Sequence, residues 1–250
     1  MFRPRIIPVL LLKNGGLVKS IRFKNHRYIG DPINAVRIFN DLKADELVFL
    51  DIEASRENRL ISTELVSKVG EEASMPFSVG GGIRSLDDIR AVLKAGAEKV
   101  VINSFAAANP EFIERASGAF GSSSIVVSFD VRRRLFKGDQ IRISSGTRPT
   151  KLSPVAFAQL MEQKGAGELI VQSIDRDGRM NGYDVELIRS VSNAVTIPVV
   201  ALGGAGTTDD LMEAYRYGRA NALAAGSLFV YKDKRRGVLI NYPEKQELNF

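Results

Sequence analysis

The chain has 250 residues, of which 44% are hydrophobic, and 35 Lys and Arg stand against 29 Asp and Glu for a formal net charge of +6. This length fits one large α/β domain or two modest ones, and no apolar run approaches the roughly 20 residues of a membrane span. The absence of cysteine excludes disulfides and favours the cytoplasm, and the single histidine, His26, excludes a multi-histidine metal site, so we expect no metal and no cofactor. The positive charges are scattered, which favours small anionic substrates over nucleic acid.

Strand-like apolar runs alternate with helical stretches along the whole chain. We predict strands over 5–12, 46–52, 76–80, 98–103, 124–130, 168–173, 197–202 and 220–225, with amphipathic helices such as 86–95, 154–164 and 208–217 between them. Eight such units without a linker favour one α/β domain, a (β/α)8 TIM barrel over 1–250, and a doubly wound sheet is the alternative. The basic tail over 231–250 contains Gly237 and Pro243, so we expect it to be atypical and without a regular helix.

One segment occurs twice. An apolar run that ends in glycines and leads to two aspartates stands at 76–88 and again, 122 residues later, at 198–210. This offset predicts two half-barrel repeats, over about 1–120 and 121–230.

The repeated glycines are candidates for phosphate binding. A glycine cluster between a strand and a helix lets backbone N–H groups approach an anion. The predicted cradles consist of Gly81, Gly82, Asn103 and Ser104 in the first half, and of Gly203, Gly204, Gly226 and Ser227 in the second. A ligand with a phosphate at each end would suit both cradles, and the alternative is that the glycines only form tight turns.

Two carboxylates are candidates for acid–base chemistry, because catalytic groups in such barrels lie where the strands end. Asp130 closes an apolar run and should project into the mouth of the barrel, where burial can tune its pKa. The alternative is a helix N-cap. Asp177 lies in the turn over 173–178 and is an equally plausible partner, although an Asp-Gly pair also favours turns.

At the opposite end of the barrel, two cations and two anions begin strands: Arg5, Glu46, Lys99 and Glu168. Because buried ions are costly unless they are paired, we expect a closed ring of four. A polar gate at the barrel floor and a purely structural ion network are both open readings.

These features resemble the cyclase subunit of imidazole glycerol phosphate synthase over residues 3–230. The stretches that carry the resemblance are Arg5-Ile6-Ile7-Pro8, Gly30-Asp31-Pro32, Asp45-Glu46-Leu47-Val48-Phe49-Leu50-Asp51-Ile52, Val79-Gly80-Gly81-Gly82-Ile83, Gly165-Ala166-Gly167-Glu168, Ser173-Ile174-Asp175-Arg176-Asp177-Gly178 and Gly203-Gly204-Ala205-Gly206. The resemblance implies a (β/α)8 barrel with a glutaminase docked at its N-terminal face. It implies that ammonia passes through the core and closes an imidazole ring on a bis-phosphorylated substrate. It would make Arg5, Glu46, Lys99 and Glu168 the ammonia gate, and Asp130 one of two catalytic carboxylates.

Two residues depart from that family's pattern. Leu11 stands where the other catalytic aspartate ends the first strand, and Leu202 replaces a serine of the second phosphate site. Leucine cannot exchange a proton, so ring closure should be crippled if that acid supplies the usual 10²–10⁴-fold. With the tail that follows Gly226, this pattern resembles a paralogous group of cyclase-like proteins from surface-polysaccharide clusters.

The resemblance to that group implies an ammonia-channelling subunit of a glutamine-dependent amidotransferase complex. Its ammonia would reach an ATP-dependent sugar-amidating enzyme, and a sugar acetamido group would become acetamidino. A working cyclase of histidine biosynthesis, with Asp130 and a substitute acid such as Asp177, is an alternative. A non-catalytic scaffold that activates a glutaminase and a sugar-phosphate isomerase are the others.

Overall fold

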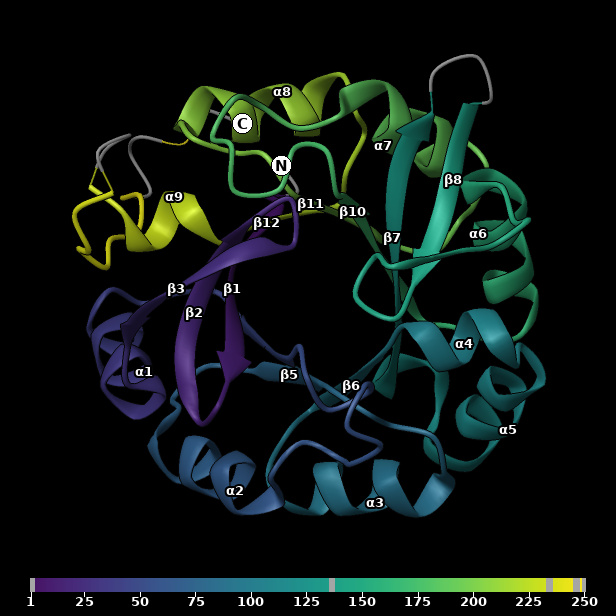
Figure 1. The fold of residues 1–250 in the computed structure, drawn as a ribbon, viewed down its shortest axis with the longest axis horizontal. Helices are drawn as coiled ribbons and strands as arrows, with labels where there is room; N and C mark the ends of the chain where they lie inside the picture. Colours follow the sequence, from purple (N-terminus) through teal and green to yellow (C-terminus); the bar gives the residue numbers. More distant parts are fainter. Residues whose placement is uncertain (1–2, 135–137, 233–235, 245–247, 249–250) are drawn as a thin grey trace.

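The chain forms a closed barrel of eight parallel strands surrounded by helices (Figure 1). The computed structural model describes residues 3–134, 138–232, 236–244 and 248. In barrel order the strands are β1 (Arg5–Lys13), β4 (Leu47–Asp51), β5 (Phe77–Gly80), β6 (Lys99–Ile102), β7 (Ile125–Arg134), β10 (Glu168–Ser173), β11 (Val199–Leu202) and β12 (Ala222–Ala225). Parallel pairing of β12 with β1 and of β10 with β7 closes the sheet. The predicted (β/α)8 barrel is confirmed, and the doubly wound alternative is wrong because the sheet has no open edge.

The outer helices are α1 (Pro32–Asp41), α2 (Thr63–Glu72), α3 (Leu86–Lys94), α5 (Glu111–Phe120), α6 (Pro154–Gln163), α7 (Val185–Ser192) and α8 (Thr208–Arg216). The shorter helical elements are α4 (Ser104–Ala108) after β6, the 3₁₀ turn η1 (Ser122–Ser124) between α5 and β7, and α9 (Ser227–Val230) after β12. Among the described helices, none has the length and apolar character that a membrane span requires.

Two antiparallel hairpins extend the barrel at its carboxyl end and were not predicted. β2 (Gly16–Ile21) pairs with β1 and with β3 (Lys24–Gly30), while β8 (Gly138–Ile143) pairs with β7 and with β9 (Arg148–Pro149). β7 therefore runs past Asp130 to Arg134, and the residue that follows Asp130 is strand rather than helix. The N-cap alternative for Asp130 is wrong.

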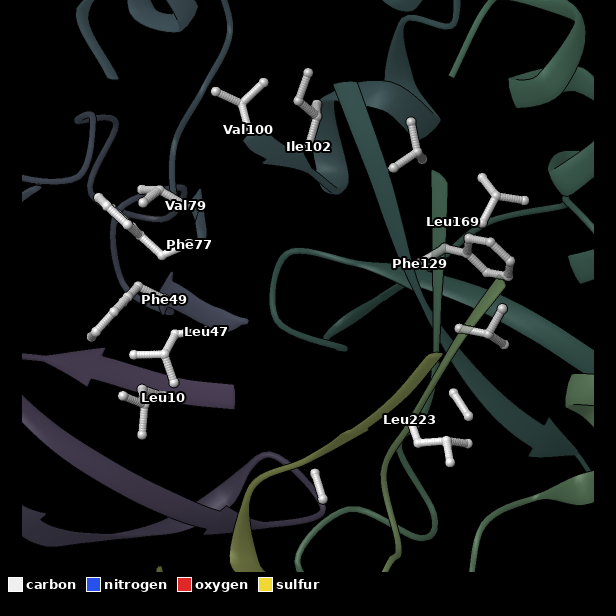
Figure 2. Close-up of a cluster of buried hydrophobic side chains, with 14 of the residues drawn as sticks. Leu10, Leu47, Phe49, Phe77, Val79, Val100, Ile102, Phe129, Leu169 and Leu223 are labelled. Carbon is white, nitrogen blue, oxygen red and sulfur yellow. The ribbon is translucent and has the colours of Figure 1, made fainter. Parts of the chain in front are cut away.

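Strand residues alternate between the two faces of the barrel. The outward side chains pack against the helices, and Figure 2 shows neighbours from successive strands in this outer cluster, among them Leu10, Phe49, Phe77 and Leu223. The inward side chains form a second apolar cluster of Ile7, Val9, Leu11, Val18, Val48, Val101, Val126, Ile170, Val200, Leu202, Ala222 and Ala224. The barrel axis is thus apolar for much of its length.

The 122-residue offset recurs in the geometry. β11 begins 122 residues after β5, and α8 begins 122 residues after α3. Both helices start with a capping box, formed by Ser85 and Asp88 in α3 and by Thr207 and Asp210 in α8. The division into two half-barrel repeats stays a prediction supported by this match.

The tail after β12 takes the place of an eighth long helix. Residues 233–235, 245–247 and 249–250 of the predicted tail lie outside the described residues. In the described part, Tyr231 bridges to Val238, and the Tyr242 ring stacks on Phe229 with centroids 5.6 Å apart. The Tyr242 hydroxyl donates to the Ile6 carbonyl at 3.0 Å, which ties the tail to β1.

Candidate functional site

A main cavity of about 620 Å³ opens at the carboxyl end of the barrel. Its walls include Leu11 from β1, Asp130 from β7 and the predicted first cradle, namely Gly81, Gly82, Asn103 and Ser104. The β2–β3 and β8–β9 connections contribute Phe23 and Gly146 to its walls. These two connections meet, since a Cβ on Gly146 would lie 3.0 Å from the Phe23 ring. The structure therefore gathers Asp130 and the first cradle around one space.

Asp130 is the buried titratable group of this cavity. Its side chain points inward from β7, the residue is 4% exposed, and the Asn103 amide donates to its Oδ1 at 3.2 Å. Burial raises the pKa of Asp130 to about 7, opposed by the Asn103 hydrogen bond and assisted by the charge of Asp177. A carboxyl with a pKa near neutrality can both donate and accept a proton at physiological pH.

The glycines of the first cradle are required by the packing of their own loops. Gly82 has φ +71°, and a Cβ there would lie 1.8 Å from the Arg59 carbonyl oxygen. On Gly81 it would lie 2.7 Å from Asp51 Cβ. Asp51, in turn, accepts from the backbone N–H groups of Glu53 and Ala54 and from Arg59. The turn explanation of these glycines is therefore sufficient by itself, and phosphate binding stays a prediction.

Of the two helices beside the first predicted cradle, α3 is capped by its own side chains and α4, in the described part of the chain, is not. The Asp88 carboxylate already accepts from the N–H groups of Arg84 and Ser85, both at 2.9 Å, at the start of α3. No side-chain cap within the described residues occupies the start of α4, which follows Asn103. The Ser104 hydroxyl accepts from the Ser144 N–H at 2.9 Å and so joins α4 to the β8–β9 connection.

The second predicted cradle surrounds a small cavity of about 30 Å³. Gly203, Gly204, Gly226 and Ser227 all line it, together with Lys19 of β2. The Lys19 ammonium donates to the Val9 carbonyl, and a Cβ on Gly226 would lie 2.5 Å from Lys19 Nζ. Burial lowers the pKa of Lys19 to about 8, against the attraction of Asp177. A cation thus lines the space that was predicted for a phosphate, and phosphate binding there stays a prediction.

Asp177 holds the β2–β3 hairpin in place. Its Oδ2 accepts from the Ser20 hydroxyl at 2.8 Å and from the Phe23 N–H at 3.2 Å, and its carbonyl accepts from the Arg22 N–H at 3.1 Å. Burial raises its pKa, opposed by the Ser20 bond. Asp177 lines the small cavity and Asp130 lines the main one, and the two cavities share Leu11, Ser20 and Gln172. The charge of Asp177 is felt at Asp130, and the pairing of the two as catalytic carboxylates stays a prediction.

Leu11 lies on the wall between the two cavities. It lines both, as do Ser20 and Gln172, and it is 9% exposed. Leu202 lines the small cavity and belongs to the inner apolar cluster. Both leucines therefore present methyl groups at the positions where the resemblance expects polar side chains.

Arg5, Glu46, Lys99 and Glu168, called the ion ring below, close the other end of the barrel. The Arg5 guanidinium contacts both Glu46 and Glu168, while Lys99 Nζ lies 3.3 Å from Glu46 Oε1 and 3.1 Å from Glu168 Oε2. Each ion thus contacts the two ions of opposite sign. The side chains of Arg5 and Lys99 are 33% and 20% exposed, and those of the glutamates are buried.

The inner apolar cluster and the hydroxyls of Ser78 and Ser128 lie between the ion ring and the main cavity. The Ser78 hydroxyl donates to Glu46 Oε1 at 2.8 Å, and Ser128 lies two residues before Asp130 on the inward face of β7. Both serines are buried. This arrangement offers few groups that could retain a small neutral molecule.

Sequence reasoning missed the groups that the hairpins carry, including Lys19, Ser20 and Arg142. The pair Asn14-Gly15 was an available signal for the first hairpin, because Asn-Gly favours a two-residue hairpin turn. Both residues have positive φ, of 50° and 75°. Nor does any described group of His, Asp and Glu have the arrangement of a metal site.

The fold and the site define a (β/α)8-barrel protein with a ligand-sized cavity at the carboxyl end and a closed ring of ions at the amino end. The family model described as "Histidine biosynthesis protein" matches residues 5–235. The chain belongs to this family.

The curated relatives agree with this family. The chain is 45% identical over 249 residues to a Pseudomonas aeruginosa protein provisionally named imidazole glycerol phosphate synthase subunit hisF2, covering 100% of this chain and 99% of that protein. It is 44% identical to a provisionally named HisF subunit of Leptospira interrogans, covering 99% and 98%. It is 43% identical to the imidazole glycerol phosphate synthase subunit HisF of Alkaliphilus metalliredigens, covering 93% and 92%.

Proposed function

We propose that this HisF-like chain is the ammonia-channelling subunit of a glutamine-dependent amidotransferase complex and serves a reaction other than imidazole ring closure. The observation that carries the proposal is the combination of a complete ion ring at one end of the barrel with Leu11 at the other. All four residues expected of an ammonia gate are present and paired, whereas Leu11 stands where one member of the expected acid–base pair would be.

The interior supports passage of ammonia. Ammonia is small and neutral, and an apolar lining with isolated hydroxyls holds it less tightly than a polar lining would. The ion ring separates this interior from the amino-terminal face, so one cation and one anion must part for a molecule to enter. Arg5 and Lys99 are the exposed members, and they are the ones that a partner at this face would contact.

The partner that fits this face is a glutaminase subunit, which releases ammonia from glutamine. The nitrogen acceptor in this proposal is a sugar acetamido group on a separate ATP-dependent enzyme. ATP transfers a phosphate-containing group to the acetamido oxygen. Ammonia then attacks the carbon, and the oxygen leaves with that group, so that the acetamido group becomes acetamidino. Two relatives carry the numbered names hisF2 and hisF3, which supports a paralogous branch of the HisF proteins. A cytoplasmic location fits all these reactions.

The cyclase assay tests this proposal. The purified chain, alone with ammonium salts or with its glutaminase and glutamine, should form no imidazole product from the bis-phosphorylated cyclase substrate. Robust turnover under either condition would end the proposal.

A working cyclase of histidine biosynthesis is the second candidate, and the near-neutral pKa of Asp130 favours it. It needs a substitute for the missing acid, and Asp177 would have to leave Ser20 and Phe23 to serve. Failure to rescue a histidine auxotroph that lacks its cyclase, despite good expression with a compatible glutaminase, would count against this candidate. A pure scaffold is the third, and it should retain ammonia delivery when Lys99 is replaced.

A further inference from the structure

The main cavity carries an excess of positive charge. Among the described residues that line it are eight Lys and Arg and three Asp and Glu. The acids already have partners: Glu53 contacts Lys13 at 3.3 Å, Asp51 contacts Arg59 at 2.5 Å, and Asp130 accepts from Asn103. The cavity's own carboxylates therefore do not balance the charge of its cations.

Two of these cations, Arg132 and Arg142, lie next to Asp130 in the β7–β8 hairpin. In the β7–β8 hairpin, Arg142 stands directly opposite Asp130 in the register, and Arg132 follows Asp130 by two residues on the same face of β7. Both arginines line the main cavity. The charges of Arg132 and Arg134 add to burial in lowering the pKa of Arg142, which shows that like charges meet here.

The hydrogen bonds of the two guanidinium groups are incomplete. Arg142 donates from Nε to the Gly146 carbonyl at 2.7 Å and from Nη2 to the Thr147 carbonyl at 3.0 Å, so its plane is fixed. Arg132 Nε is buried and has no hydrogen-bond partner among the described residues. Its nearest carboxylate, Asp175, lies at 4.0 Å and accepts the Arg133 N–H instead.

We propose that Arg132 and Arg142 form an oxyanion-binding subsite beside Asp130, which holds a phosphate or carboxylate group of the ligand that enters the main cavity. A planar guanidinium with free N–H groups matches an oxyanion in charge and geometry. Arg132 also lines a shallow groove of about 490 Å³ with Arg22, Lys24 and Asp175. The ligand can therefore extend from the subsite over the rim of the cavity.

The subsite goes beyond the proposed function, in which the nitrogen acceptor lies on a separate enzyme, and it requires only that the main cavity takes an anionic ligand. It lies on the β7–β8 hairpin, on a different element from the first predicted cradle, with which it shares the main cavity. Its own test therefore does not depend on ammonia transfer.

The test follows the arginine Nε–Hε resonances of the full chain by NMR during titration with inorganic phosphate and, separately, with acetate, each at an ionic strength matched with chloride. The Arg132 and Arg142 signals are assigned by their absence in Arg132→Gln and Arg142→Gln. We expect both signals to shift saturably. If the signals respond to phosphate alone, the subsite is specific for a phosphate group. If they respond to acetate as well, the subsite accepts either oxyanion.

Matched variants separate the subsite from general electrostatics. Arg132→Gln should weaken binding, followed on the Arg142 signal, about tenfold or more, the loss expected for a hydrogen bond to a charged group. Arg134→Gln removes the same charge from the same strand outside the cavity and should change binding less than about threefold. Arg142→Lys keeps the charge and loses the planar geometry, so it should fall between these two.

Two results would overturn the subsite: no saturable shift of either arginine signal with phosphate or acetate, or an equal loss in Arg134→Gln and Arg132→Gln. Because Arg142 also holds the β8–β9 connection, the decisive comparison uses Arg132, which donates to no part of that connection. Saturable shifts in a chain that fails to deliver ammonia would count against the proposed function and leave the subsite standing.

Discussion

Asp130 lies in an environment far from that of a free side chain. It is buried at the wall of the main cavity, faces Asn103, and has a pKa of about 7. Its neighbour across the cavity wall, Leu11, cannot exchange a proton. At this scale, Asp130 can exchange a proton at the cavity wall and Leu11 cannot.

The raised pKa of Asp130 makes stability depend on pH in a direction opposite to that of a carboxylate whose pKa is lowered by a cation or by hydrogen bonds. Between about pH 4 and pH 7 the folded chain keeps a proton that the unfolded chain has lost, so the free energy of unfolding falls as pH rises. Asp130→Asn removes this dependence. Denaturant unfolding across this range should show a difference between the two proteins that changes by up to about 4 kcal/mol. Parallel curves would contradict the assignment.

Restoring a carboxyl at position 11 should restore part of the lost chemistry. Leu11→Asp places an ionisable group on the wall that Asp130 shares, and we expect imidazole-forming turnover with ammonium salts to rise at least about tenfold. The cost should be about 1–3 kcal/mol of stability, because a polar group replaces a buried leucine. Leu11→Asn is the control, since it has the same size and cost but cannot exchange a proton. Equal turnover in the two variants would show that the missing acid is not what limits ring closure.

At the scale of elements, the barrel strands were predictable and the hairpins were missed. Each barrel strand lies within a few residues of its predicted range, because a buried strand between helices leaves a continuous apolar run. The hairpins are polar and partly exposed, and β3 has no apolar run that could mark it. Asn14-Gly15 marked one turn, but no local pattern connects Ser20 to Asp177, which lies 157 residues away.

The candidate site divides in the same way. The residues at strand ends, such as Asp130 and Asn103, could be placed by counting along each strand. The four ions of the ion ring could be paired by the cost of burying a lone charge. The placement of Lys19 at the second cradle and the contact of Asp177 with Ser20 depend on where the β2–β3 hairpin folds back, which only tertiary packing decides.

The loop glycines should be far less tolerant of substitution than a helical glycine. Gly82→Ala drives a methyl group into the Arg59 carbonyl at a positive φ, and we expect a loss of about 3 kcal/mol or more. Gly118→Ala in α5 meets open space and should stabilise by about 0.5–1 kcal/mol. Chemical denaturation of both variants checks this, and a Gly82→Ala protein as stable as the native chain would contradict the packing account.

At the scale of the whole molecule, the ion ring joins the two predicted half-barrels through charge, since Arg5, Glu46 and Lys99 precede residue 121 and Glu168 follows it. Lys99→Met leaves two buried glutamates with one cation and should cost about 3 kcal/mol. Adding Glu168→Gln restores the balance around Arg5 and Glu46, so the double variant should be more stable than Lys99→Met alone. Additive losses in unfolding experiments would show that the four ions do not act as a unit.

The most direct measurement of ammonia passage is isotope transfer in the assembled complex. The chain, its glutaminase and the ATP-dependent amidating enzyme are supplied with amide-¹⁵N glutamine in a medium that contains unlabelled ammonium, and the ¹⁵N content of the amidated sugar is measured by mass spectrometry. A closed route through the barrel predicts that the product keeps the glutamine label in the native complex and loses it to dilution when Lys99 and Glu168 are both neutralised. A product of the native complex with the isotope ratio of the bulk ammonium would contradict the account.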